Sequence, residues 1–240
     1  MLSALARVRR RLPLAARVDA CELLDGGCLT LPEVEANLMD LARLNRLPGG
    51  AATSVEAIER LSTGADGLTV LDAGTGYADL PLAFAARGWR TTAIDTHPDV
   101  LALARRQTSH EPLVTVLESD AGSLPFEEGA FDVAHCSLLL HHLRPHEAVT
   151  ILRELARVAR RGVVVNDLRR GIWPFAATAV TTALLARSGV TRSDGLTSAR
   201  RAWTIAELDA FLAAAGLAVR WRSPAWMPRV VTAAVTSATA

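Results

Sequence analysis

One block of the sequence, residues 68–95, constrains the fold more than any other, because it joins a short apolar strand to a helix through a glycine turn. The strand is expected over 68–71, and the turn contains Gly74 and Gly76. Glycine tolerates the unusual backbone angles of such a turn and lets a ligand approach the backbone closely. A second strand ends at Asp95, nineteen residues after Gly76. A carboxylate there can accept hydrogen bonds from both hydroxyls of a ribose, so the block predicts a ligand that contains a nucleoside.

Strands and helices alternate through most of the remaining chain. Further strands are expected over 91–94, 113–117, 131–137, 163–165, 218–221 and 230–235, and helices over 98–107 and 146–160. Asp79 is expected to cap the helix after the glycine turn, and Gly162 to end the helix 146–160. Thr204 and Glu207 have the spacing of a capping box before one more helix. This alternation predicts an α/β fold in which helices cover both faces of a mostly parallel sheet.

Two segments depart from the alternation. Residues 1–66 read as helical, with helices expected over 32–46 and 54–61. Residues 168–203 combine a mainly apolar helix, 172–186, with a polar loop. An insertion after a strand's carboxyl end lies over the ligand crevice of an open sheet, so this segment is interpreted as a substrate lid. Ordinary packing of an extra helix is the alternative.

Composition excludes several classes of protein. The 26 basic residues are all Arg and balance 25 acidic residues, which removes lysine-dependent chemistry and any global attraction to nucleic acid. Three cysteines without a C-x-x-C motif indicate neither a disulfide framework nor a zinc site, and a reducing cytoplasm is expected. No apolar run is long enough for a transmembrane helix. The first 17 residues, with five Arg, are expected to form a solvated amphipathic helix, or else a weak contact with a membrane surface.

Two cofactor classes fit a glycine turn of this kind. A dinucleotide site requires a third glycine at position 79, but this position is Asp79, whose carboxylate would repel a pyrophosphate at the helix start. Asp72, at the end of the first strand, suits a ligand that carries a sulfonium and an ammonium group. Both residues favour S-adenosylmethionine (SAM) over NAD.

Four blocks, in this order, resemble the class I SAM-dependent methyltransferases. They are D-A-G-T-G at 72–76, I-D at 94–95, S-D-A-G-S-L-P-F at 119–126 and F-D-V-A-H-C-S-L-L-L-H-H-L at 131–143. Ala78 stands where the family often has a third glycine. The resemblance implies a Rossmann-like, seven-stranded, mostly parallel sheet. It divides the chain into an N-terminal helical cap, 1–66, and a methyltransferase domain, 67–240, with the lid insertion at about 168–203.

The resemblance also implies a set of cofactor-binding residues. Asp95 would hold the ribose hydroxyls, and Asp120 with the backbone of Ala121 would contact the adenine. Asn45 and Arg46, at the end of a helix that covers the methionine tail in many such enzymes, would bind its carboxylate. The full set is Asp72, Gly74, Thr75, Gly76, Asp95, Thr96, Asp120, Ala121, Ser137, Leu138, Asn45 and Arg46.

Four of the six histidines fall within residues 135–146. His142 and His146 have a spacing that could share a metal, but Pro145 separates them and no acid completes the set on the same face, so no metal site is expected. The family resemblance instead places an imidazole beside the transferred methyl group. His141 or His142, preferably His142, would accept a proton from a hydroxyl of the substrate, unless both only shape the pocket. His135 is expected in the core or the pocket wall.

The expected activity is methyl transfer from SAM to a small apolar or aromatic acceptor. Residues 21–50 and 166–204 are similar to bacterial methyltransferases of phenolic, quinone or polyketide-type metabolites, which favours a phenolic hydroxyl. The alternatives are carbon methylation of a quinone or polyketide precursor, a non-catalytic SAM-binding protein and, last, an NAD-dependent oxidoreductase. Methylation of nucleic acid is not expected, because the chain has no basic domain and no N/D-P-P-Y/F signature after the fourth strand.

Overall fold

The computed structural model describes residues 14, 16–24, 26–62 and 67–236. Its strands are β1 Thr69–Ala73, β2 Arg90–Asp95, β3 Val114–Glu118, β4 Phe131–Ser137, β5 Ala159–Leu168, β6 Leu217–Arg222 and β7 Arg229–Thr236. Its helices are α2 Leu31–Leu44, α3 Ala51–Leu61, α4 Asp79–Ala85, α5 Pro98–Gln107, the 3-10 helix η1 Leu140–His142, α6 Pro145–Val158, α7 Ile172–Leu185, α8 Gly189–Arg201 and α9 Ile205–Ala214. Most of the basic N-terminal segment, residues 1–13 and 15, lies outside the described residues.

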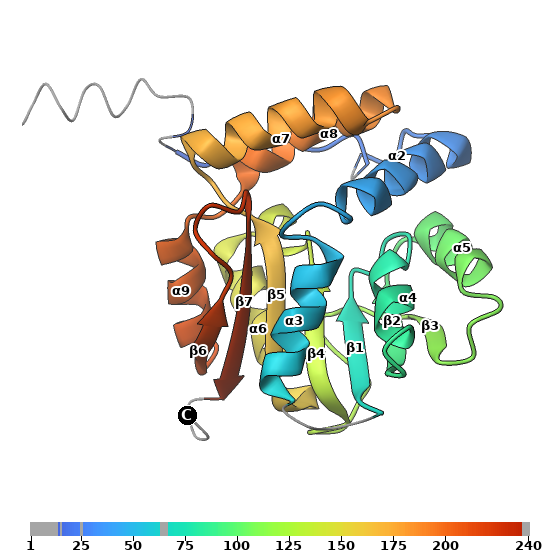
Figure 1. Cartoon of the computed structure of the whole chain (residues 1–240), viewed down its shortest axis with the longest axis vertical. Coiled ribbons are helices and arrows are strands. Elements are labelled where there is room, and N and C mark those ends of the chain that lie inside the picture. The colour runs from blue at the N-terminus through green and yellow to red at the C-terminus, as the bar shows by residue number, and fades with distance from the viewer. Residues whose placement is uncertain (1–13, 15, 25, 63–66, 237–240) are drawn as a thin grey trace, which may run out of the picture.

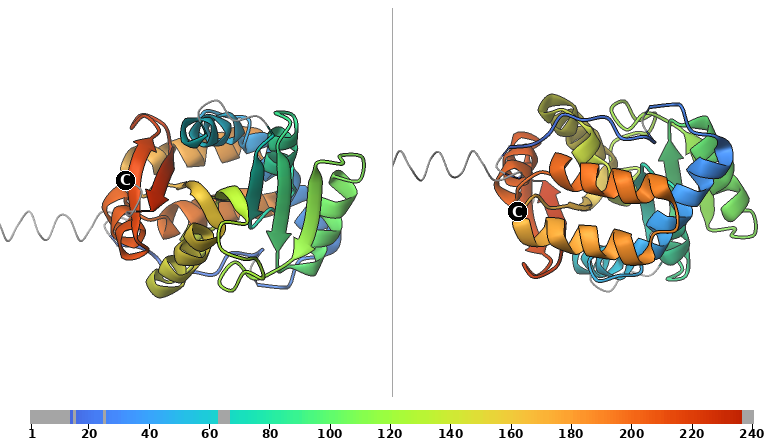
Figure 2. Two further views of the ribbon diagram at one scale, coloured as in Figure 1. Left: turned by 90° about the horizontal axis from the view of Figure 1, so that it is seen from below. Right: turned by 90° about the horizontal axis from the view of Figure 1, so that it is seen from above.

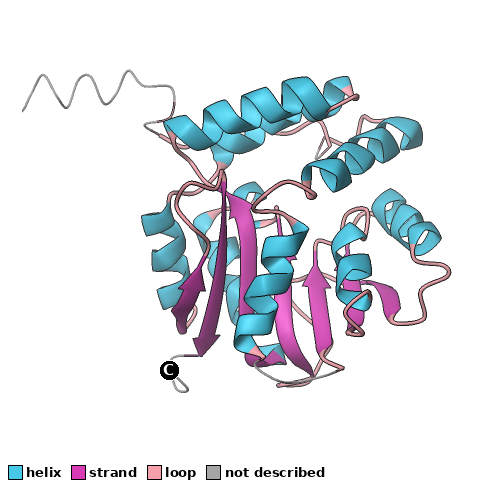
Figure 3. Cartoon of the chain, in the orientation of Figure 1, coloured by secondary structure: helices cyan, strands magenta, loops and turns pink. Residues whose placement is uncertain are grey.

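The strands form one sheet in the order β3-β2-β1-β4-β5-β7-β6 (Figures 1 and 3). All neighbouring pairs from β3 to β5 are parallel, whereas β7 runs antiparallel to both β5 and β6. This confirms the expected seven-stranded, mostly parallel sheet. The strand order reverses at β1, which pairs with β2 on one side and β4 on the other. In such sheets the crevice outside the carboxyl ends at the reversal binds ligands.

Apolar side chains cover both faces of the sheet. Leu152 and Leu155 of α6 are fully buried in one cluster, and Ile58 of α3 and Phe84 of α4 are fully buried in another. α3 thus shares its core with the strands, and the division of the chain at residue 66 stays a prediction. No helix of the described residues is long and apolar enough to cross a membrane.

Helices α7 and α8, here called the roof helices, lie side by side over the carboxyl edge of the sheet (Figure 2). The expected polar loop after α7 is wrong, because 13 of its residues form α8. Its polar side chains find partners inside the protein: the Thr191 hydroxyl donates to Asn37 Oδ1 over 2.8 Å, and Asp194 accepts the backbone N–H groups of Leu23 and Leu24. Tertiary hydrogen bonds therefore make this polar sequence helical. That the roof helices open and close as a lid stays a prediction.

Two expected helix boundaries are also wrong. Ala78, with a φ of 59°, takes the N-cap position of α4, so Asp79 is the first residue of the helix and its carboxylate accepts a hydrogen bond from Asn45 instead. α6 ends at Val158 and continues directly into β5, which contains Gly162. The capping box of Thr204 and Glu207 is confirmed.

Gly162 explains why β5 can pair with β7 at this point. Its φ is 150°, and a Cβ atom on it would lie 2.3 Å from the backbone oxygen of Ala234 in β7. That contact is with backbone, which cannot move aside without breaking the ladder between the two strands.

We predict that Gly162→Ala lowers the free energy of unfolding by about 3 kcal/mol, because the new methyl group collides with the neighbouring strand. Urea unfolding followed by circular dichroism measures the change. Gly189→Ala is the matched control, since nothing lies within 4 Å of a Cβ atom at that helix start. Equal stability of the two variants would contradict this account of Gly162.

Candidate active site

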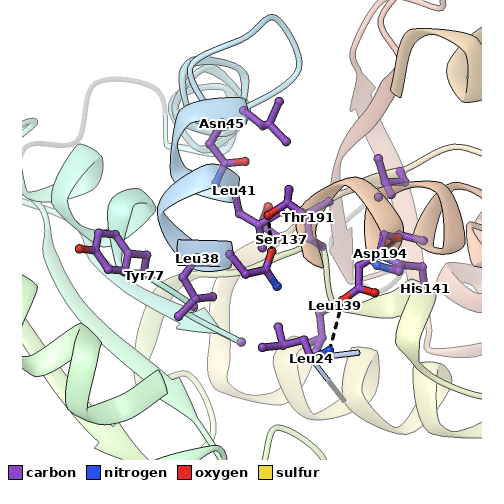
Figure 4. A pocket seen from close by; sticks show the side chains of 18 of the residues that line it. Leu24, Leu38, Leu41, Asn45, Tyr77, Ser137, Leu139, His141, Thr191 and Asp194 are labelled. Carbon is purple, nitrogen blue, oxygen red and sulfur yellow. Dashed lines mark hydrogen bonds between the residues drawn. The ribbon is translucent and has the colours of Figure 1, made fainter. Parts of the chain in front are cut away.

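A cavity of about 470 Å³ lies at the carboxyl ends of the strands. Its walls come from the loops after β1, β2 and β4, from α2 and the roof helices, and from the start of β7. Figure 4 shows Leu38 and Leu41 of α2 on one side of the cavity and His141 with Asp194 on the other. One cavity therefore joins the glycine turn to the histidines that follow β4.

The glycine turn and the end of β2 form one part of this cavity. Gly74 and Gly76 have φ angles of 73° and 53°, which favour glycine. The carboxylate of Asp95 is oriented by backbone donors: Oδ1 accepts the N–H groups of Thr96 and His97 over 2.9 and 3.0 Å, and Oδ2 lies 3.4 Å from the N of Gly76. All five residues line the cavity.

Two polar atoms at this part of the cavity have no hydrogen-bond partner among the described residues. They are the buried hydroxyl oxygens of Thr75 and Ser137, and both residues line the cavity. Buried polar groups usually have partners, so an unsatisfied pair beside a glycine turn fits a polar ligand. Leu138 also lines the cavity, next to Ser137, with a φ of 53°.

Asp72 lies beneath the cavity and is not among the residues that line it. It stands opposite His135 in the register of β1 and β4, and its Oδ1 is 2.7 Å from His135 Nδ1. His135 Nε2 is 3.0 Å from the hydroxyl of Ser54, which also accepts a hydrogen bond from Asn166 Nδ2 over 2.9 Å. His135 is completely buried, which confirms its expected place in the core. Asp72 supports the cavity floor through this buried chain of hydrogen bonds.

Asn45 connects two opposite charges at the cavity wall. Its Nδ2 donates to Asp79 Oδ2 over 2.9 Å, and its Oδ1 accepts from Arg229 over 2.6 Å. Burial raises the pKa of Asp79 and lowers that of Arg229 to about 10, so the guanidinium stays charged at neutral pH. Arg229 is 8% exposed and forms no ion pair with the described part of the chain. The sequence analysis did not identify Arg229, because this residue lies far along the chain from the motifs and reaches the cavity only in the folded protein.

Besides Asp72, three more predicted cofactor residues do not line the cavity. Arg46 is exposed at the end of α2. Asp120 and Ala121 follow β3, and Asp120 Oδ1 accepts the backbone N–H of Gly122 over 2.8 Å, as in a local turn. Their roles in binding stay predictions.

His141 and His142 both line the cavity but differ in their partners. His141 Nδ1 is 2.6 Å from Asp167 Oδ1, and its backbone N–H donates to Asp167 Oδ2. Burial alone would raise the pKa of Asp167, but His141 and the backbone N–H of Leu168 hold this pKa below its ordinary value. An ionised carboxylate only accepts hydrogen bonds, so Nδ1 of His141 carries the proton that this pair shares.

Glu22 lies close to both histidines, which the sequence did not reveal. Its Oε1 is 3.7 Å from His141 Nε2, and its Oε2 is 3.8 Å from His142 Nε2. One side-chain atom from each of Glu22, His141 and His142 lies within 4.8 Å of the other two. A carboxylate therefore accompanies two histidines, but these are His141 and His142 and not the pair His142 and His146 that the sequence suggested. Arg201 lies 3.5 Å from Glu22 Oε1 and brings a positive charge to the same place. The guanidinium of Arg201 therefore already supplies a positive charge beside this carboxylate and the two imidazoles.

Comparisons with known proteins agree with this geometry. Residues 70–162 match the family model of a methyltransferase domain. The demethylmenaquinone methyltransferase of Thermus thermophilus is 38% identical over 96 residues, which cover 39% of this chain and 43% of that protein. The chain spans about half the length of the curated relatives it matches.

Two solved structures share the fold. A SAM-dependent methyltransferase from Aquifex aeolicus has a TM-score of 0.61 at 19% identity, over 86% of this chain and 98% of that one. The magnesium protoporphyrin IX methyltransferase of Synechocystis, solved with bound S-adenosylhomocysteine (SAH), has a TM-score of 0.57 at 16% identity, over 98% and 94%. The fold is thus that of the SAM-dependent methyltransferases. Within that fold, the stretch that matches the methyltransferase family model, residues 70–162, contains the glycine turn, Asp95 and the two histidines that follow β4.

We predict that Asp95→Asn weakens SAH binding about tenfold or more, because a carboxylate that accepts hydrogen bonds from a ligand contributes about 1.5–3 kcal/mol. Isothermal titration calorimetry measures the affinity. Asp99→Asn, in the first turn of α5 and outside the cavity lining, is the matched control. An unchanged affinity of Asp95→Asn would remove Asp95 from the ligand site.

Proposed function

We propose that this protein transfers a methyl group from SAM to a phenolic hydroxyl of a small apolar acceptor. The observation that carries the proposal is that one cavity contains the glycine turn with Asp95 and also the His141–Asp167 pair. SAM, when bound, supplies a methyl group on a positively charged sulfur. The remaining requirements are to hold the acceptor, exclude water and remove a proton, and the chain's own residues supply these.

The acceptor part of the cavity is mainly apolar. Leu38, Leu41 and Leu44 of α2 line it, together with Leu139 after β4 and Leu168 at the end of β5. The roof helices close it from above with threonine side chains. Such walls favour an aromatic or aliphatic body with few polar groups. The similarity to the demethylmenaquinone methyltransferase of Thermus supports an acceptor of the quinone type.

His141 is the base in this proposal, in place of the preferred His142. Its Nε2 accepts the hydroxyl proton while Asp167, held 2.6 Å from Nδ1, stabilises the imidazolium that forms. Both histidines lie near the carboxylate of Glu22, but the ring of His142 is closer to solvent, with 24% of its side chain exposed. The proposal prefers His141 because its side chain is almost completely buried and its Nδ1 lies 2.6 Å from Asp167 Oδ1.

We predict that His141→Ala lowers kcat about a hundredfold or more on a phenolic acceptor, since a positioned base contributes about that factor. Asp167→Asn is expected to lower kcat as well, because it removes the charge that stabilises the imidazolium. Initial rates over a range of acceptor concentrations check the assignment, because loss of the base should lower kcat and leave the KM for the acceptor nearly unchanged.

The matched control is His110→Ala, an exposed histidine outside the cavity lining. Should His142→Ala lose activity while His141→Ala keeps the full rate, the base is misassigned. Methylation of a carbon atom with the His141→Ala rate unchanged would favour the alternative of a carbon methyltransferase.

Asn45, Asp79 and Arg229 would hold the methionine end of SAM. That end carries an ammonium and a carboxylate, and the wall presents the half-buried carboxylate of Asp79 and the buried guanidinium of Arg229, joined by one amide. A buried cation without an ion-pair partner is costly, and a ligand carboxylate would remove that cost. Arg229 therefore replaces the exposed Arg46 as the proposed carboxylate partner.

We predict that Arg229→Gln weakens SAH binding about tenfold or more but leaves the binding of methylthioadenosine unchanged, because the latter lacks the amino-acid part. Calorimetry with both ligands measures this, with NADH as a test of the dinucleotide alternative. Arg169→Gln is the control, because that side chain bonds the backbone oxygen of Ala225 outside the cavity. Equal losses for both ligands would indicate a general defect of the fold instead.

A further inference from the structure

Helix α7 presents its polar side inward and its apolar side outward. Thr178 and Thr182 are buried and line the cavity, whereas Val180 and Leu184 are 56% and 76% exposed. In an ordinary surface helix the apolar side packs on the core and the polar side faces water. The reversed arrangement leaves a stripe of exposed apolar side chains on α7. The helix itself lies over the sheet, at the top of the molecule in Figure 1.

The stripe continues beyond the helix at its N-terminal end. Trp173 is 59% exposed, and its Nε1 donates to the backbone oxygen of Trp226, whose side chain is 60% exposed. Tryptophans with an apolar body and a polar tip are enriched where protein meets the boundary between lipid and water. We call the exposed set the roof face: Ile172, Trp173, Val180, Leu184, Leu185 and Trp226.

The exposed charged side chains of the roof helices are all positive. Residues 171–203 contain one acidic residue, Asp194, which is buried and accepts two backbone N–H groups. Arg187, Arg192 and Arg200, by contrast, are all exposed. A second copy of the chain on this face would bring like charges together, whereas an anionic surface is complementary to it.

The start of α7 lies beside the end of α8. The N–H of Arg170 donates to the oxygen of Trp203, and the guanidinium carbon of Arg200 lies 5.5 Å from the centre of the Phe175 ring. The exposed Arg200 therefore lies at the same end of the roof helices as Trp173.

We propose that the roof face docks on the surface of a membrane that contains anionic lipids. α7, with 14 residues and a length of about 21 Å, would lie parallel to that surface with its apolar stripe at the boundary of headgroups and acyl chains. The exposed arginines of the roof helices would pair with the lipid phosphates. Docking is a property of the outer surface, and it does not depend on which acceptor is methylated.

The test is cosedimentation of the full chain with vesicles. Vesicles of phosphatidylcholine mixed with phosphatidylglycerol should bind the protein, and those of phosphatidylcholine alone should bind it much less. Salt should weaken the binding, since it screens the arginines. Val180→Ser with Leu184→Ser should weaken binding about tenfold, because two apolar side chains leave the lipid boundary.

The matched control is Val219→Ser with Leu117→Ser, an exposed valine and leucine on β6 and β3. It should bind vesicles as the unaltered chain does, and circular dichroism verifies the fold of both variants. Three results would overturn the proposal: no binding to either kind of vesicle, equal loss in the control, or binding that the α7 substitutions leave unchanged. A dimer in light scattering that the α7 substitutions dissociate would instead assign the roof face to a second copy.

Discussion

The reversal of strand order at β1 is the constraint on which the rest of the site depends. The chain leaves β1 through the glycine turn toward β2 and β3, and it later returns to β4 on the opposite side. Because these strands are parallel, their carboxyl ends meet at one edge, and side chains distant in sequence share one cavity. Asp95 comes from the end of β2, and His141 follows β4. Asp167, at the end of β5, is beside His141 because β4 and β5 are neighbours.

The floor beneath that edge is polar, which is unusual for a parallel sheet covered on both faces. Asp72, His135, Ser54 and Asn166 form one buried chain of hydrogen bonds from β1 through β4 and α3 to β5. A buried carboxylate is tolerated only when its partners are present, so each of these residues restricts where the others can lie. The network therefore holds α3 against the strands at the depth of the glycine turn. The acid of the D-A-G-T-G block contributes to the site through this network.

Local signals in the sequence were sufficient for the framework. The expected bounds of β4 and α5 agree with the structure at both ends, since a buried strand and a helix that begins at Pro98 carry their own signals. The same holds for the glycine turn and for the capping box at Thr204. The predictions that failed, and the residues that were missed, concern side chains whose partners are distant in the sequence. Gly162 looks like a helix end, but its neighbour is β7, and Glu22 and Arg229 reach the cavity only when the chain has folded.

One physical reason explains both why α8 was expected to be a loop and why the apolar side of α7 is exposed. Polar side chains normally indicate a surface, so Thr191 and Asp194 suggested a loop, yet they point toward partners inside the protein. When the interior of a helix pair takes polar groups, the apolar residues of the same sequence are displaced to the outside, as on α7. A sequence pattern gives the separation of polar and apolar sides but not which side faces inward. Only the position of the cavity under the roof helices determines that choice, and it leaves the apolar side of α7 available for an external partner.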